Sequence, residues 1–132
     1  DAVLLRTLPL PDADRVVVLE PRVGGEARGG SPGFLAAWEV RSRALARVAA
    51  VRGRDLTLLR GDAAERVDGL AVSGAYFDVL GVRPALGRAI GRADDVPGAP
   101  RVVVLAAGLW ARAFASDPAI VGRTVTLDGA TL

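Results

Sequence analysis

The spacing of apolar residues differs from one part of this chain to another, and each spacing predicts one kind of secondary structure. Continuous apolar runs at residues 16–19 and 102–105 predict two short buried strands. From residue 49 to residue 72 the pattern is that of extended chain, interrupted by the turn-prone Arg60-Gly61-Asp62. This stretch therefore predicts a β-hairpin or a meander of strands.

The last part of the chain predicts a second hairpin. Residues 123–127 alternate between apolar and polar positions, as in a half-exposed strand. Asp128-Gly129 follows, and this pair favours the type I′ turn that closes a two-residue hairpin loop. Because only three residues remain after the turn, we expect the returning strand to be cut short and the chain to be a fragment or a trimmed domain.

Helical spacing of apolar residues predicts two main helices, near residues 32–46 and 106–115. A shorter helix is predicted after Ser73, whose hydroxyl is expected to cap it, and Gly81 is expected to end it in the left-handed conformation. Residues 117–122 predict a miniature helix with an aspartate cap, a proline start and a glycine stop.

Together these elements predict the α+β class, with a small mixed β-sheet covered by two main helices. The chain is expected to be a single domain or a partial domain over residues 1–132, with residues 1–14 as an extended lead-in. Seven large side chains are expected in the core: Phe34, Trp38, Phe77, Leu80, Val103, Leu105 and Trp110.

The composition excludes most common kinds of catalytic and metal-binding site. The chain has no His and no Cys, and all 17 of its basic residues are arginine. Histidine and cysteine supply the common zinc and iron–sulfur ligands and the usual catalytic relays. Lysine is needed for a P-loop or a Schiff base. We therefore assign no catalytic, cofactor-binding or metal-binding residue, and we expect no cofactor.

One catalytic alternative needs no histidine. A hydrolase can work with two carboxyl groups, one of them kept protonated by its surroundings. The candidates are Asp94 and Asp95, with Asp78 and Glu65. This alternative requires two of these carboxyl groups to face each other across a cleft.

The charge pattern does not favour nucleic acid as a partner. The formal net charge is only +2, and the arginines are scattered among 15 acidic residues. A nucleic-acid site needs basic residues clustered on one face.

Several stretches resemble the MacB-like periplasmic core domain of ABC-transporter permeases, especially the FtsX-like, duplicated orphan permeases. The most specific is the run from residue 73 to residue 84, Ser-Gly-Ala-Tyr-Phe-Asp-Val-Leu-Gly-Val-Arg-Pro, followed by Gly87-Arg88. The other stretches are residues 2–9, 11–16, 110–114, 117–118, 121–122 and 124–129.

The resemblance implies a porter-like, non-catalytic module on the periplasmic side of the cytoplasmic membrane, attached through residues 1–14 to a first transmembrane helix. Such a module would couple the motion of membrane helices to substrate export or to contact with an adaptor. The implied partners are the rest of the permease with its transmembrane helices, a separate cytoplasmic ATPase and a periplasmic adaptor protein.

Overall fold

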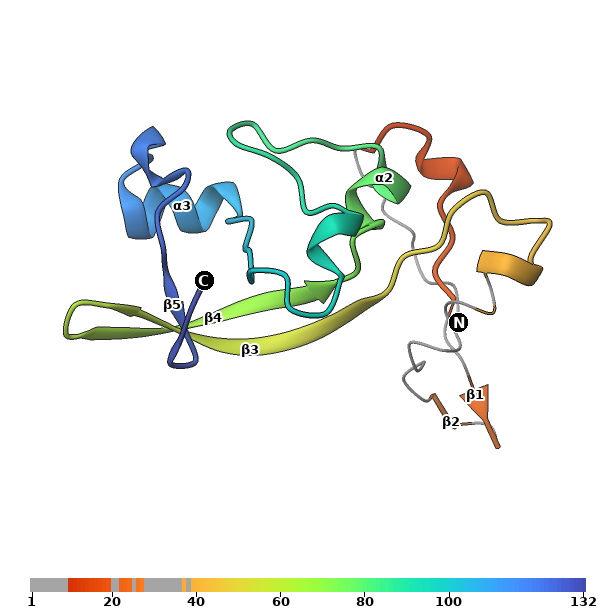
Figure 1. Cartoon of the computed structure of the whole chain (residues 1–132), viewed down its shortest axis with the longest axis horizontal. Helices are drawn as coiled ribbons and strands as arrows, with labels where there is room; N and C mark the ends of the chain where they lie inside the picture. The colour runs from red at the N-terminus through yellow and green to blue at the C-terminus, as the bar shows by residue number, and fades with distance from the viewer. Residues whose placement is uncertain (1–9, 20–21, 25, 28–36, 38) are drawn as a thin grey trace.

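The structure is a computed structural model that describes residues 10–19, 22–24, 26–27, 37 and 39–132 (Figure 1). Residues 37 and 39–41 are helical. The other elements are, in chain order, η1 Ala13–Arg15, β1 Arg22–Val23, β2 Glu26–Ala27, β3 Val51–Arg60, β4 Ala63–Val72, α2 Tyr76–Leu80, η2 Arg92–Asp94, α3 Ala107–Phe114, η3 Pro118–Ile120, β5 Thr126–Leu127 and β6 Ala130–Thr131. No helix in this described part is both long and apolar enough to cross a membrane.

A long antiparallel hairpin of β3 and β4 runs through the molecule (Figure 1). Its register joins ten residue pairs, from Val51 opposite Val72 at one end to Arg60 opposite Ala63 at the tip. Gly61 begins the two-residue turn with φ of 57°, which suits a primed turn between twisted strands. The hairpin and its turn were predicted, and both are confirmed.

The second hairpin joins the first near its tip, at Leu58 and Leu59 of β3. Strand β5 pairs with β3 at only two positions, and β6 then pairs with β5, so the sheet order is β4-β3-β5-β6. Asp128 and Gly129 both have positive φ, 51° and 76°, as a type I′ turn requires. The Asp128 carboxylate accepts a hydrogen bond from the Thr57 N–H at 2.7 Å, which fastens this turn to β3.

The α+β class is therefore confirmed, while the predicted mixing of strand directions is not. Every strand pairing in the described residues is antiparallel. Helices α2 and α3 both lie on one side of the long hairpin (Figure 1). The bounds of α3 match the predicted helix, and Gly81 ends α2 in the left-handed conformation with φ of 67°.

The hydrophobic core lies where α3 packs on the crossing of the two hairpins. Its buried members are Leu58, Val67, Ala113, Val125 and Leu127. Leu58 is the largest fully buried side chain, with 1% of its surface exposed. The buried residue of α3 is Ala113, so this helix faces the leucines and valines of the core through a small side chain.

A cluster of ion pairs lies beside that core, between the hairpin and α3. The Glu65 carboxylate on β4 accepts hydrogen bonds from the Arg112 guanidinium of α3 at 2.6 and 3.0 Å. Arg60 lies 3.6 Å from the same carboxylate and donates a hydrogen bond to the Ala113 carbonyl at 2.6 Å. These contacts join the hairpin to the C-terminal end of α3, where a cation also suits the helix dipole.

Both predicted apolar strands are wrong. Residues 102–105 and 16–19 have no strand partner, and Val18 is 86% exposed. An apolar run becomes a strand only where another strand offers its backbone hydrogen bonds. In the described residues β3 accepts β5 on that edge at two positions only.

The predicted first helix and the predicted core also need correction. Helical structure ends at Arg41, not at residue 46, and the start of this helix lies outside the described residues. Phe34 and Trp38 lie outside them as well. Val103 is 38% exposed, whereas the other four predicted core residues are half-buried: Phe77, Leu80, Leu105 and Trp110. The core instead centres on β3, whose alternation places Leu58 inward.

The outer edge of β4 has no strand paired to it in the described part of the sheet. This edge runs the full ten residues of the strand.

Replacing Leu58 with alanine should lower the free energy of unfolding by about 2–5 kcal/mol, because the cavity would open at the centre of the core. Leu59, the next residue on the same strand, is 40% exposed, and Leu59→Ala should cost about 1 kcal/mol or less. Urea unfolding followed by circular dichroism measures both. Equal losses in the two variants would contradict this assignment of the core.

Candidate functional site

The stretch from residue 73 to residue 95 folds into a corner at the end of the long hairpin, which we call the signature corner. Ser73 begins it by extending the hairpin ladder one step beyond the strands. Its N–H donates to the Ala50 carbonyl at 3.0 Å, and its hydroxyl accepts from the Ala50 N–H at 2.9 Å. The prediction that the Ser73 hydroxyl caps α2 is therefore wrong. The hydroxyl makes no capping hydrogen bond to α2 and instead joins the chain after β4 to the chain before β3.

Gly74 is the point of closest approach in the signature corner. A Cβ atom placed on it would lie 2.5 Å from the carbonyl oxygen of Gly91 and 2.7 Å from the Cα of Arg92. Both neighbours are backbone atoms, which cannot turn aside as a flexible side chain can. The Gly74 N–H also donates to the Asp95 carboxylate, so glycine lets the two chain segments meet.

Arg88 and Asp94 form the ion pair of the corner. The guanidinium donates to both carboxylate oxygens at 2.7 Å, a bidentate arrangement, and the Gly91 N–H donates to the same carboxylate at 2.8 Å. The Asp94 side chain is 12% exposed. These hydrogen bonds, first from Arg88 and then from Gly91, lower the pKa of Asp94 from 3.8 to about 2.

The acids of the catalytic alternative are separated by this arrangement. Asp94 turns back to Arg88 while Asp95 turns to Gly74, so the two carboxylates serve different contacts. Glu65 lies in the ion-pair cluster under α3, and Asp78 is exposed on α2. A carboxyl group with a pKa of about 2 is ionised at neutral pH, so Asp94 is unsuited to act as a general acid.

Metal-ligating side chains do not gather in the part of the chain that the structure describes. No group of three or more His, Cys, Asp and Glu residues there is placed to hold a metal ion.

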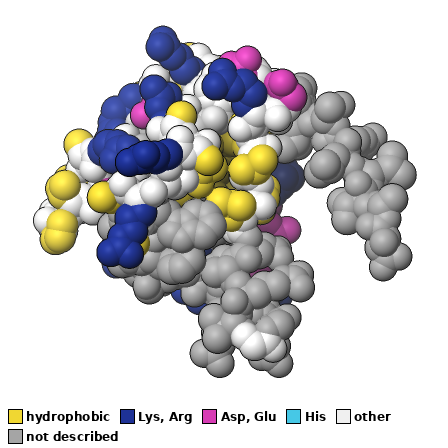
Figure 2. All heavy atoms as spheres, turned by 90° about the vertical axis from the view of Figure 1, so that its right-hand side faces the viewer, with side chains coloured by type: hydrophobic (Ala, Val, Ile, Leu, Met, Phe, Trp, Pro, Cys, Tyr) yellow, Lys and Arg dark blue, Asp and Glu magenta, His cyan; other side chains and the backbone are white. Residues whose placement is uncertain are grey.

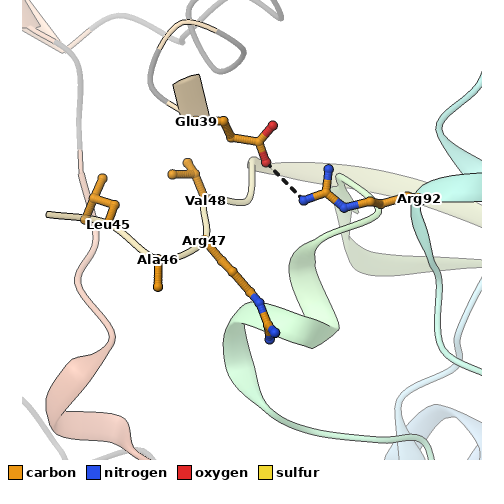
Figure 3. A pocket seen from close by; sticks show the side chains of 6 residues that line it. All are labelled: Glu39, Leu45, Ala46, Arg47, Val48 and Arg92. Atoms are coloured by element: carbon orange, nitrogen blue, oxygen red, sulfur yellow. Dashed lines mark hydrogen bonds and ion pairs between the residues drawn. The ribbon is translucent and has the colours of Figure 1, made fainter. Parts of the chain in front are cut away.

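A small polar pocket lies beside the corner (Figure 3). It has a volume of about 220 Å³. Arg92 reaches across it to the Glu39 carboxylate at 3.3 Å, and Arg47 extends toward α2, where it donates to the Asp78 carbonyl at 3.3 Å. Both arginines are therefore committed to contacts within the domain.

Arginine side chains are spread over the surface in several separate groups on the face shown in Figure 2, with hydrophobic side chains between them. At the top of this face, acidic side chains lie beside the basic ones. Mixed charge of this kind does not form the basic stripe that a nucleic acid requires.

Sequence patterns gave no sign of the corner's two polar contacts. Asp95 and Gly74 are 21 residues apart. Arg88 lies in a loop and Asp94 ends the short helix η2, so no helical or strand period relates this second pair. The only local signal was Gly74 itself, a glycine between a strand and a helix.

The family model described as the MacB-like periplasmic core domain matches residues 3–132, almost the whole chain. No curated protein and no solved structure matches. The match includes the long hairpin and the whole signature corner. It does not single out the FtsX-like subgroup, which stays a prediction.

Replacing Gly74 with alanine should destabilise the domain by about 1–3 kcal/mol, because the new methyl group overlaps backbone that must then move. Gly53→Ala is the matched control, since a Cβ there meets no atom within 4 Å on an exposed strand. Urea unfolding compares the two. If Gly53→Ala were as unstable as Gly74→Ala, the loss of stability would come from replacing glycine as such and not from the close approach of the Gly91 backbone.

The Arg88–Asp94 pair should make stability depend on acid pH. Because the pKa of Asp94 is lower in the folded chain, at about 2, than its ordinary 3.8, the pair stabilises the fold fully above the ordinary value. This contribution is lost as pH falls through about 2. The thermal midpoints of the wild type and Asp94→Asn should therefore differ most near neutral pH and converge in acid. A constant difference across the pH range would contradict the linkage.

Proposed function

The chain belongs to the MacB-like periplasmic core domain family, and from this membership we propose that it couples the motion of a permease's membrane helices to events outside the membrane. The family indicates an extracytoplasmic domain of an ABC-transporter-type permease. The finer role, a link to substrate export or to contact with a periplasmic adaptor, is the proposal. The family match over residues 3–132 is the observation that carries it.

The contacts at both ends of the long hairpin support a mechanical role. At one end, Ser73 closes the ladder and the signature corner binds it to the loop that contains Asp94 and Asp95. Toward the tip, Glu65 and Arg112 join the hairpin to α3. A structure held by such cross-links moves as a unit, which a part that transmits displacement must do.

The chemistry of the side chains favours a non-catalytic part. Three of the four candidate carboxylates, Asp94, Asp95 and Glu65, are held in structural contacts, and the sequence offers arginine as its only basic side chain. Arginine stays protonated at physiological pH, so it cannot act as a general base. In this proposal, nucleotide hydrolysis belongs to a separate cytoplasmic ATPase, and the partners are the transmembrane helices of the permease and an adaptor.

Spin labels in the full permease can test the coupling. Because the chain has no cysteine, Asp62→Cys at the hairpin tip gives one label site in this domain. We expect the distance from this label to a label on a membrane helix to change between the nucleotide-free and the vanadate-trapped ATPase states. Pulsed electron paramagnetic resonance measures the distance.

A control pair within the domain separates rigid motion from distortion. Labels at Asp62→Cys and Ala111→Cys, the latter on the exposed side of α3, should keep one distance in both states. An unchanged distance to the membrane helix would refute the coupling. In spheroplasts, a membrane-impermeant maleimide should also label Asp62→Cys without lysis, as the extracytoplasmic location requires.

A further inference from the structure

An apolar groove with a volume of about 600 Å³ lies beside the signature corner, and Arg88, the partner of Asp94, is among its lining residues. Its walls are the 84–90 loop, the 101–105 stretch, the inner face of α3 at Trp110, and residues 120–125. The 101–105 stretch contains the apolar run 102–105, which forms no strand. Its valines line the groove and do not pair in a sheet.

Several exposed large apolar side chains are gathered in the groove. Leu86, Val102, Val103 and Val121 are between 36% and 53% exposed, and all four line it. Apolar side chains gathered in one concave site, unlike the same residues scattered singly, mark a binding surface.

The charges of the groove have one sign. Three arginines line it, Arg88, Arg101 and Arg123, and no lining residue is acidic. Arg88 is held by Asp94, and Arg123 lies 3.9 Å from the Asp117 carboxylate. Arg101 makes no ion pair with any other residue that the structure describes, and it is exposed next to Val102.

We propose that this groove binds a single-chain amphiphile with an anionic head group. The hydrocarbon chain lies against the valines of the 101–105 stretch, and the head group pairs with Arg101, with Arg123 beside it. An arginine fork suits carboxylate, sulfate and phosphate oxygens alike. The volume lies within the roughly 300–1,000 Å³ usual for small-ligand sites, which favours a small amphiphile over a peptide segment.

This inference does not rest on the proposed coupling. A domain that moves with the ATPase cycle need not bind an amphiphile, and an amphiphile can bind whether or not the domain moves. Failure in the spin-label experiment and failure in the experiment below are therefore distinguishable.

Photo-crosslinking of the full permease in nanodiscs of zwitterionic lipid tests the proposal. The probe is laurate with a diazirine on its chain, and mass spectrometry maps the labelled peptides. We expect labelling of the 101–105 and 120–125 stretches. Laurate and dodecyl sulfate should compete with the probe, while dodecyl maltoside and dodecyltrimethylammonium should not.

Three variants make the test specific. Arg101→Gln should reduce labelling of the groove by about tenfold or more, since a charge-assisted hydrogen bond is lost. Val121→Trp should reduce it by filling the groove at a position that is already exposed. Arg54→Gln, an exposed arginine of β3 outside the groove, is the matched control and should label like the wild type.

Equal competition by the neutral and cationic amphiphiles would overturn the proposal, because apolar contact alone would then explain labelling. Wild-type labelling in both Arg101→Gln and Val121→Trp would overturn it as well. Competition by an acidic, apolar peptide without competition by laurate would assign the groove to a protein partner instead.

Discussion

The antiparallel pairing of β3 with β4 is the constraint on which the other described contacts depend. Ten residue pairs fix the register, and the register decides which side chains face α3. With Leu58 and Val67 inward, the sheet offers an apolar patch to Ala113, and β5 can add Leu127 to the same patch. A shift of β4 by one residue against β3 would turn Val67 to the opposite face from Leu58 and break up the core.

The signature corner joins the end of this hairpin to the chain that follows it. Ser73 continues the ladder, Gly74 meets the Gly91 backbone, and Asp94 and Asp95 fix the loop that has turned back. The residues that most clearly resemble the family in sequence are thus explained by backbone geometry. This signature therefore records how the chain turns, and its last residues, Pro84, Gly87 and Arg88, also line the apolar groove.

Local turn chemistry was predicted well from the sequence, and long-range packing was not. Asp128-Gly129 and Gly81 adopt the positive φ expected of them, because glycine and aspartate enter the left-handed region more readily than most residues. The apolar run at 102–105 looked like a buried strand, yet its conformation depends on a partner strand that sequence periodicity cannot supply. For the same reason the predicted core centred on aromatic residues, while the observed core centres on Leu58. The Gly74–Asp95 contact of the signature corner and the apolar groove arise only when segments distant in the sequence meet.

The unpaired outer edge of β4 affects how readily molecules of this protein associate. Alternate residues of this ten-residue strand point their backbone N–H and C=O groups to that edge, where the described sheet offers no ladder partner. Such an edge is a template for strand addition between molecules, the first step of aggregation. The exposed charges of Arg66 and Asp68 lie on this strand and oppose close stacking of apolar neighbours. Neutralising these two side chains should therefore favour association between molecules along this edge.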